Sequence, residues 1–407
     1  MSLSEDPPVK SWNLEFHLAV AAIRVTSSSE LPIEQVQKQF NEKYKIEVPS
    51  NIIIEQAILD EQYRQESSPE SFRGLTSKYA EYAKARVFSI DYRLAPQNQF
   101  PASLCDSVAA YLYLLDPGLE TGFKPINPKK IVFMGKSAGG GLALATLLFL
   151  RDVGLPLPGG AVVLVDLTYS MPSFWDAELD KVDFIHKKLG SREIGPSSPV
   201  ADEYITNAKA LSNKIAQKKP TIVGHPSFTE IPRFQLYCTN EALAIPYVSP
   251  MLAESLGGLP PILCQVGGLE RLRDEGILFN YKAAYPHEYQ LPSYATKNFE
   301  KSPFKNPTKV ILEVYDDMPH VWQLFTFFKT SQVALERCGN FIKCVTSIKD
   351  NNTSIIDLLK EDVISPSISI SPSFVRMRVS VDSEIRELNK TDQDCLKWDK
   401  IGIVPKT

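Results

Sequence analysis

The sequence has few of the side chains that build metal sites, disulfides or nucleic-acid surfaces. Its 407 residues include five histidines and six cysteines, and no two cysteines form a C-x-x-C pair. No Cys/His cluster has zinc-site spacing, so we expect no metal and interpret the cysteines as reduced thiols of an intracellular protein. The 44 basic and 48 acidic residues give a net charge of -4. This balance gives no basic surface of the kind that binds nucleic acid.

The sequence also lacks a secretion signal and a membrane-spanning run. Residues 1–10 are polar and acidic, unlike a signal peptide. One apolar window, residues 131–150, is interrupted by Lys136 and four glycines and divides better into a strand, a turn and a helix. We therefore expect a cytoplasmic protein without a transmembrane segment, and the sequence leaves peripheral association with lipid droplets or membranes open.

Apolar strands alternate with helices through the middle of the chain. The pattern predicts strands at 87–91, 131–134, 161–165, 261–266 and 310–315, and helices that end near residues 115, 150, 284 and 344, the last of them beginning near 321. Such alternation is typical of a mainly parallel sheet with helices on both faces, which is an α/β fold.

The ends of the chain and one insertion depart from this pattern. Residues 12–26 indicate an amphipathic helix with Phe16, Val20 and Ile23 on one face, although the alternation from Trp12 also suits a strand. We divide the chain into an N-terminal region (1–66), an α/β domain (67–345) with a long insertion (167–250), and a tail (346–407). The tail is either a small β appendage or partly disordered.

A G-x-S-x-G motif marks a candidate nucleophile. Ser137 lies in Gly135-Lys136-Ser137-Ala138-Gly139, directly after a predicted strand and before a helix rich in glycine and alanine. Small neighbours allow the strained turn of a nucleophile elbow to close, and the serine hydroxyl then stands at the helix N-terminus. The backbone N–H of Ala138 is the oxyanion donor that such an elbow supplies.

A serine nucleophile needs a base and an acid that orients the base. Of the five histidines, His320 alone follows a predicted strand end. The acid of such a triad lies between serine and histidine in the chain. Glu270 and Asp274 are the candidates, and we favour Glu270 because Asp274 falls in the first turn of a helix, where an acid is favourable for structural reasons.

Several motifs resemble the hormone-sensitive-lipase-like branch of the α/β-hydrolases, and most closely its fungal members. They are Ser-Ile-Asp-Tyr-Arg-Leu-Ala-Pro (89–96), Phe-Pro-Ala (100–102), Gly-Lys-Ser-Ala-Gly-Gly (135–140), Leu-Pro-Pro (259–261) and Leu-Arg-Asp-Glu (272–275). The resemblance covers roughly residues 68–345 and implies Ser137, Glu270 and His320 as the catalytic residues. It also implies that residues 1–66 form a helical lid, for which a helix that packs on the core is the alternative.

One part of the family pattern is missing. Family members carry a His-Gly-Gly motif after a central strand, and its N–H groups form much of the oxyanion hole. No His-Gly pair occurs in this sequence. The resemblance implies that the missing strand would lie between the strands that end at Asp91 and Met134. Early strands of the sheet are therefore expected to be absent, through splicing or an imperfect gene sequence.

Three functions fit these observations. The first is a serine carboxylesterase or lipase that cleaves short- to medium-chain esters of small molecules without a cofactor. The second is a catalytically impaired relative that binds an acyl or sterol-like ligand. The third is a poorly folded product without function. The triad motifs favour the first, whereas the missing strand favours the other two.

Overall fold

The structure is a computed structural model. It describes residues 9–27, 73–164, 245–270, 272–291, 302–347 and 373–388, together with residues 35, 206, 237, 238, 242, 371, 404 and 405. Most of the insertion at 167–250 lies outside the described residues, as does most of the expected lid region.

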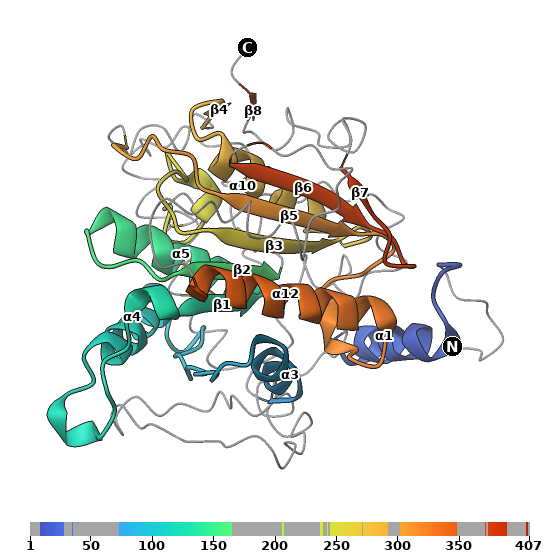
Figure 1. Cartoon of the computed structure of the whole chain (residues 1–407), viewed down its shortest axis with the longest axis horizontal. Coiled ribbons are helices and arrows are strands. Elements are labelled where there is room, and N and C mark those ends of the chain that lie inside the picture. The colour runs from blue at the N-terminus through green and yellow to red at the C-terminus, as the bar shows by residue number, and fades with distance from the viewer. Residues whose placement is uncertain are drawn as a thin grey trace.

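A six-stranded sheet forms the centre of the fold, in the order β1-β2-β3-β5-β6-β7 (Figure 1). The strands are β1 (Val132–Lys136), β2 (Gly160–Leu164), β3 (Ile262–Gly267), β5 (Val310–Tyr315), β6 (Phe374–Val379) and β7 (Ile385–Glu387). Neighbours from β1 to β6 pair in parallel, and β7 pairs with β6 in antiparallel fashion. A separate short pair joins β4 (Tyr289–Gln290) to β8 (Val404–Pro405). The predicted mainly parallel sheet is confirmed.

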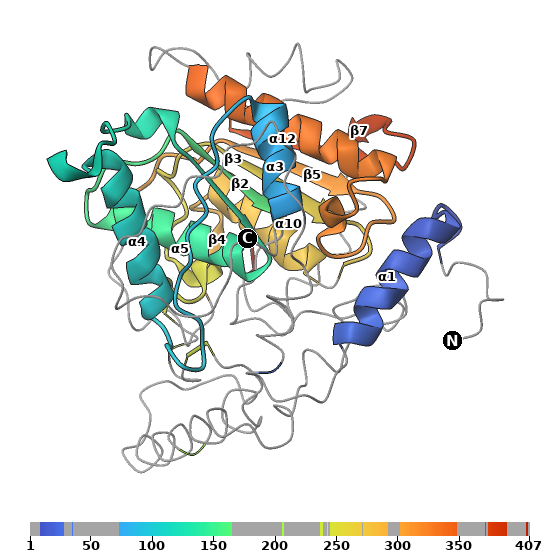
Figure 2. The same cartoon turned by 90° about the horizontal axis from the view of Figure 1, so that it is seen from below.

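Helices cover both faces of this sheet (Figure 2). One face packs against α5 (Ala138–Asp152) and α10 (Arg273–Ala284), with α4 (Ala102–Leu115) outside α5. The other face packs against α12 (Lys329–Ser347), which α3 (Arg73–Ala83) crosses. Four 3-10 turns complete the described elements: η3 (Leu119–Thr121), η4 (Pro128–Lys130), η6 (Pro250–Leu252) and η7 (Trp322–Leu324).

The alternation of side chains along β2 shows why the sheet needs two helical layers. Ala161 and Val163 lie in the buried cluster that includes α5 and α10. Val162 and Leu164 lie in the cluster that includes α3 and α12. A strand that is buried on both faces is apolar throughout, which is what its sequence shows.

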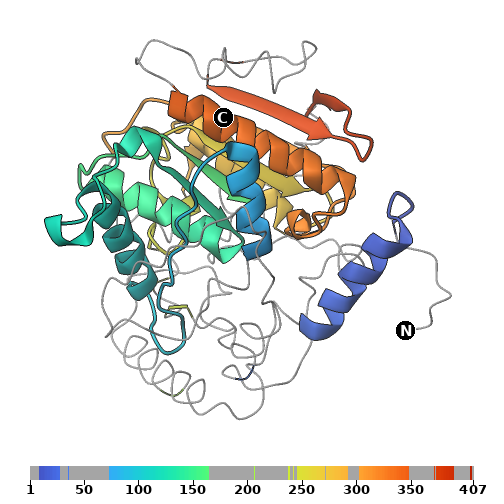
Figure 3. The same cartoon turned by 60° about the horizontal axis from the view of Figure 1, so that its bottom comes forward.

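The N-terminal helix α1 (Leu14–Ser27) confirms the predicted amphipathic helix. Its Phe16 side chain is fully buried and stacks on Phe328, with ring centroids 4.3 Å apart. Figure 3 shows α1 beside the segment that leads into α12. This packing agrees with the alternative that the N-terminal helix packs on the core. The assignment of residues 1–66 as a lid stays a prediction.

The predicted strand at 87–91 is wrong. These residues have no regular secondary structure, and Val87 and Phe88 are 47% and 40% exposed. Within the described chain β1 pairs with β2 alone, so it is an edge strand and its side chains are only half-buried. A parallel strand needs a neighbour for its backbone N–H and C=O groups, and no strand of the described chain pairs with residues 87–91.

The predicted helix at 321–344 begins later than expected. Val321 has a positive φ of 51°, which interrupts a helix, and α12 starts at Lys329. The intervening residues form η7 and turns that bury Trp322, Phe325 and Phe328. These aromatic side chains pack in the same buried cluster as α1, so tertiary packing overrides the local helical preference.

The tail contributes to the main sheet. Residues 374–379 form β6, which pairs in parallel with β5 from Val310↔Phe374 to Tyr315↔Val379. Its apolar residues Val375, Met377 and Val379 are fully buried. The described part of the tail therefore adds strands to the main sheet and shares the core of the α/β domain.

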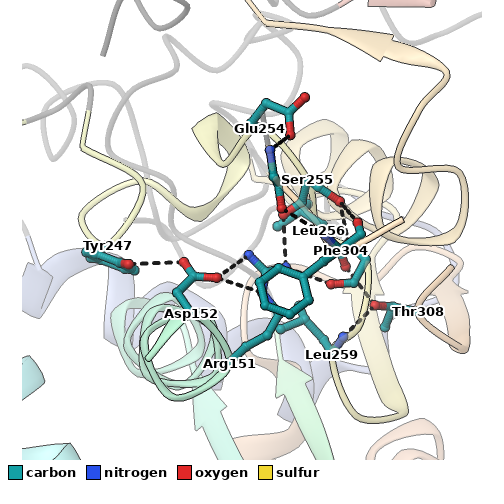
Figure 4. A network of polar contacts seen from close by, with 11 residues as sticks. Arg151, Asp152, Tyr247, Glu254, Ser255, Leu256, Leu259, Phe304 and Thr308 are labelled. Carbon is teal, nitrogen blue, oxygen red and sulfur yellow. Dashed lines mark hydrogen bonds and ion pairs between the residues drawn. The ribbon is translucent and has the colours of Figure 1, made fainter. Parts of the chain in front are cut away.

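A polar network fixes the end of α5 that lies farthest from Ser137 (Figure 4). The guanidinium of Arg151 donates to the carbonyls of Ser255 and Gly257 at 3.0 and 2.7 Å. It also lies 4.4 Å from the ring centroid of Phe304. The loop before β3 is thereby tied to α5, so the helix that begins at the candidate nucleophile is held at both ends.

Candidate active site

Ser137 occupies a strained turn between β1 and α5. Its φ and ψ are 50° and -128°, a region that residues with a side chain rarely adopt. Its N–H donates to the carbonyl of Leu164 at 2.9 Å, which ties the turn to the end of β2. A Cβ on Gly135 would lie 2.0 Å from the Gly139 carbonyl oxygen, so this glycine is required for the turn to close. The geometry is that of a nucleophile elbow.

Glu270 and His320 are in direct contact. Glu270 Oε2 lies 3.0 Å from His320 Nδ1, and Glu270 Oε1 accepts the N–H of Gly267 at 2.9 Å. Both side chains are buried. Gly267 ends β3, and His320 follows β5, the next strand in the sheet. The parallel strands therefore bring the acid and the histidine to the same edge of the sheet.

Asp274 is engaged elsewhere. Its carboxylate pairs with the Arg273 guanidinium at 2.9 Å, in the first turn of α10. That guanidinium also donates to the Gly268 carbonyl at 3.1 Å. The arrangement fits the structural role expected for an acid at a helix N-terminus. Of the two candidate acids, it is Glu270 that contacts the histidine.

The charge of Lys136, a half-buried residue whose Nζ atom is buried, lowers the pKa of the histidine. Burial first, and the charge of Lys136 second, lower the pKa of His320 to about 3. Burial also lowers the pKa of Lys136 well below its ordinary value. The imidazole is consequently neutral at neutral pH, which is the form that a general base requires. In the sequence Lys136 is visible only as a charge that interrupts an apolar run, and its effect on the histidine depends on the fold.

Ala138 is the first residue of α5, and its side chain is exposed. The first N–H groups of a helix have no partner within the helix and carry the positive end of its dipole. The Ala138 N–H can therefore stabilise a negative oxygen next to Ser137. The second donor loop of the family would lie beside β1, where the described structure has the free edge of the sheet.

A buried polar network lies behind the histidine loop. Glu313 on β5 accepts from Arg337 Nε at 2.8 Å and from the Tyr315 hydroxyl at 2.8 Å. Gln265 on β3 donates to Glu313 at 3.0 Å and accepts from Gln323 of η7 at 3.2 Å. The network joins two strands, α12 and η7, and it supports the turn that follows His320.

The predicted site residues thus all lie at the carboxyl ends of the parallel strands. In Figure 1 the arrowheads of the parallel strands point the same way, and Ser137, Glu270 and His320 follow the ends of β1, β3 and β5. Glu270 and His320 touch each other, whereas β2 and β3 separate the strand of Ser137 from that of His320. Their joint role in catalysis stays a prediction.

Comparison with known sequences identifies the family. A sequence model described as the alpha/beta hydrolase fold matches residues 66–285, which is more than half of the chain. The chain belongs to the α/β-hydrolase fold family. The resemblance to its hormone-sensitive-lipase branch is confirmed, and with it the class of carboxylic ester hydrolases.

The relatives of this hydrolase are named as an acetyl-hydrolase and as esterases. An acetyl-hydrolase of Streptomyces hygroscopicus is 29% identical over 284 residues, which are 69% of this chain and 72% of the relative. The esterase LipI of Mycobacterium tuberculosis is 27% identical, and the match spans about half of each chain, 51% and 52%. Among solved structures, an esterase of the bacterial hormone-sensitive lipase family is 25% identical, with a TM-score of 0.55 over 83% of this chain and 99% of that one.

These comparisons do not test two finer expectations, that the resemblance is closest to fungal members and that the protein is cytoplasmic. None of the helices in the described part of the chain is long and apolar enough to cross a membrane.

Proposed function

We propose that this hydrolase cleaves short- to medium-chain carboxylic esters through an acyl-enzyme on Ser137. The contact of Glu270 with His320, at the sheet edge that also carries the strained Ser137 turn, is the observation that supports this most strongly. We further propose that the protein is cytoplasmic.

In this mechanism His320 accepts the Ser137 hydroxyl proton while the serine oxygen attacks the ester carbonyl carbon. His320 then returns that proton to the leaving alcohol, and a water molecule repeats the cycle to release the acid. Glu270 keeps the other proton on Nδ1 and stabilises the imidazolium that forms between the two transfers. The Ala138 N–H donates to the carbonyl oxygen as it becomes negative.

We also propose that turnover is low, because the glycine loop that supplies the other oxyanion donors is missing. Losing one donor typically lowers kcat by about 10²–10³. Against an ordinary kcat of about 10 s⁻¹, this predicts at most roughly 0.01–0.1 s⁻¹ for p-nitrophenyl butyrate. In the described part of the chain β1 pairs with β2 alone, and this supports the expectation, because the missing strand would carry the loop on the other side of β1.

Two measurements test the proposal. Ser137→Ala should abolish labelling by a fluorophosphonate and any turnover of p-nitrophenyl acetate, while the melting temperature stays unchanged. Retained turnover in a clean Ser137→Ala preparation would refute the nucleophile. A folded wild-type protein with neither labelling nor turnover would instead favour the impaired relative that binds an acyl or sterol-like ligand.

The oxyanion part has its own test. A family-type strand with a His-Gly-Gly loop, inserted between Glu66 and Ser67, should raise turnover strongly, and the same insertion with Ala in place of both glycines is the matched control. Turnover near 10 s⁻¹ in the natural chain would contradict the proposal, and we would then look for another donor.

A further inference from the structure

The loop that carries His320 contains two residues in strained backbone conformations. Asp317 and Val321 have φ values of 60° and 51°, and the second is β-branched. Backbone conformations of this kind are unfavourable for residues with a side chain and persist only where surrounding contacts enforce them. The position of His320 therefore depends on what holds residues 316–321.

The N-terminal segment holds the loop from one side. The Trp12 indole N–H donates to the backbone carbonyl of Asp317 at 2.7 Å, and the Ser11 hydroxyl donates to the Asp317 carboxylate at 2.7 Å. Trp12 is itself buried, with its ring 5.0 Å from that of Phe16. A rigid aromatic side chain thus fixes the backbone three residues before His320.

The C-terminal tail holds the loop from another side. The Asp316 N–H donates to the Val379 carbonyl of β6 at 2.9 Å. Arg378 Nε donates to Asp316 Oδ1 at 2.5 Å, and a second guanidinium nitrogen forms an ion pair with the same oxygen. The two side chains are less than a quarter exposed, so solvent screens this pair only partly.

The turn that carries Glu270 completes the support. The Leu269 N–H donates to the Met318 carbonyl at 3.0 Å, and a Cβ on Gly267 would lie 2.4 Å from that oxygen. The N-terminal segment and β6 therefore both contact the histidine loop, which itself packs against the turn that carries Glu270.

We propose that Trp12 and Arg378 are positioning residues for the proposed esterase, which hold His320 in register with Glu270 and Ser137 through Asp316 and Asp317. The inference rests on the proposed function, and both residues lie outside the segment that the family model matches. Misplacing a reacting group by about 1 Å can lower a rate by about 10²-fold.

The first test measures chemistry. Trp12→Phe keeps an aromatic side chain, smaller than the indole, but removes the N–H donor, and Arg378→Met removes the ion pair. We expect each to slow fluorophosphonate labelling of Ser137 and kcat for p-nitrophenyl butyrate by about 10- to 100-fold, with KM within a factor of two. Arg378→Lys should recover part of the rate.

A matched control comes from the same strand. Arg376 also lies on β6, but it contacts Tyr281 and Glu387 instead of the histidine loop. We expect Arg376→Met to label and turn over at the wild-type rate. If Arg376→Met lost as much labelling and turnover as Arg378→Met, substitutions on β6 would act only by lowering the stability of the protein, and the inference would be overturned.

The second test does not depend on activity. The chain has five histidines, so imidazole NMR signals can be resolved and that of His320 assigned with His320→Gln. Trp12→Phe and Arg378→Met should shift this signal, and Arg376→Met should not. A wild-type protein that neither labels nor turns over refutes the proposed function alone, whereas an unshifted His320 signal in both variants overturns the positioning role.

Discussion

Replacing Glu270 by glutamine tests the candidate acid with almost no change in side-chain volume. In the structure one carboxylate oxygen faces His320 Nδ1 at 3.0 Å, and the other accepts the Gly267 N–H at 2.9 Å. An amide has one oxygen and one NH2 group, so it can satisfy only one of these two donors. If the amide oxygen faces His320, the NH2 group meets the Gly267 N–H, and a donor then faces a donor in a buried site. If the oxygen faces Gly267, the NH2 group meets Nδ1, which can accept it only when His320 changes its tautomer.

The chemical consequence follows from the tautomer. If the amide oxygen stays on Gly267, the NH2 group faces Nδ1 and forces the proton of His320 onto Nε2. The nitrogen that should accept the serine proton is then already protonated. In Ser-His-Asp enzymes the equivalent change lowers kcat by about 10⁴-fold, and we expect a loss of about 10³–10⁴-fold in the labelling rate of Ser137. The mismatch should also lower the free energy of unfolding by about 1–3 kcal/mol.

Asp274→Asn is the matched control. It weakens a partly exposed ion pair with Arg273, which is worth about 0–1 kcal/mol, and leaves the His320 contact in place. Labelling by a fluorophosphonate in excess measures both variants without requiring turnover, and urea unfolding at pH 7 measures stability. If Asp274→Asn loses far more reactivity than Glu270→Gln at equal stability, the acid is misassigned.

Three further results are expected. Lys136→Met should raise the pKa of His320, because the lysine charge lowers it, and so move the acid limb of the labelling rate to higher pH; an unmoved limb would contradict the coupling. Because the folded-state pKa of His320 lies below its ordinary value, the unfolded chain takes up this proton first, and stability should fall as the pH drops from about 6.5 towards 3, by at most about 1.4 kcal/mol per pH unit. Urea unfolding of wild type and His320→Gln at pH 7 and 4.5 measures this difference, and an equal loss in both proteins would rule it out. Arg337→Met should lower the free energy of unfolding in urea by about 3–5 kcal/mol, because it leaves the Glu313 carboxylate buried without its cation. A loss below about 1 kcal/mol, the size expected for an exposed pair such as Lys78–Glu81, would show that water reaches the Glu313 carboxylate.

The sequence predicted most accurately the elements whose signals are local. Strands β2, β3 and β5 are continuous apolar runs, and each lies within about a residue of its predicted range. The contact of Glu270 with His320 agrees with the predicted choice of acid. It forms because the two residues follow β3 and β5, which are neighbouring parallel strands of the sheet. These features depend on short segments and on the general rule that parallel strands end at one edge.

Other features depend on partners that are distant in the sequence. Residues 87–91 have an apolar strand pattern, but a strand also needs a paired backbone, and no neighbouring strand is described there. Residues 374–379 have a weaker pattern, yet β5 pairs with them along six residues. The contacts of Trp12 and Arg378 with the histidine loop join residues that are 305 and 62 positions apart in the sequence. No rule based on sequence spacing would indicate them.

The candidate nucleophile keeps its geometry although β1 is the outermost strand of the sheet among the described residues, because its turn depends on local contacts. The Ser137 turn closes because Gly135 admits the carbonyl of Gly139 and because Leu164 accepts the Ser137 N–H, and all of these groups lie in β1, α5 and β2. The second oxyanion donor has no such local source, since it would come from a loop on the other side of β1. A chain that lacks that strand can therefore retain a strained serine and a paired histidine while it loses stabilisation of the transition state. Phosphonylation of Ser137 by a reagent as reactive as a fluorophosphonate should accordingly be slowed less than the turnover of an ester, and the ratio of the two rates measures the missing donor.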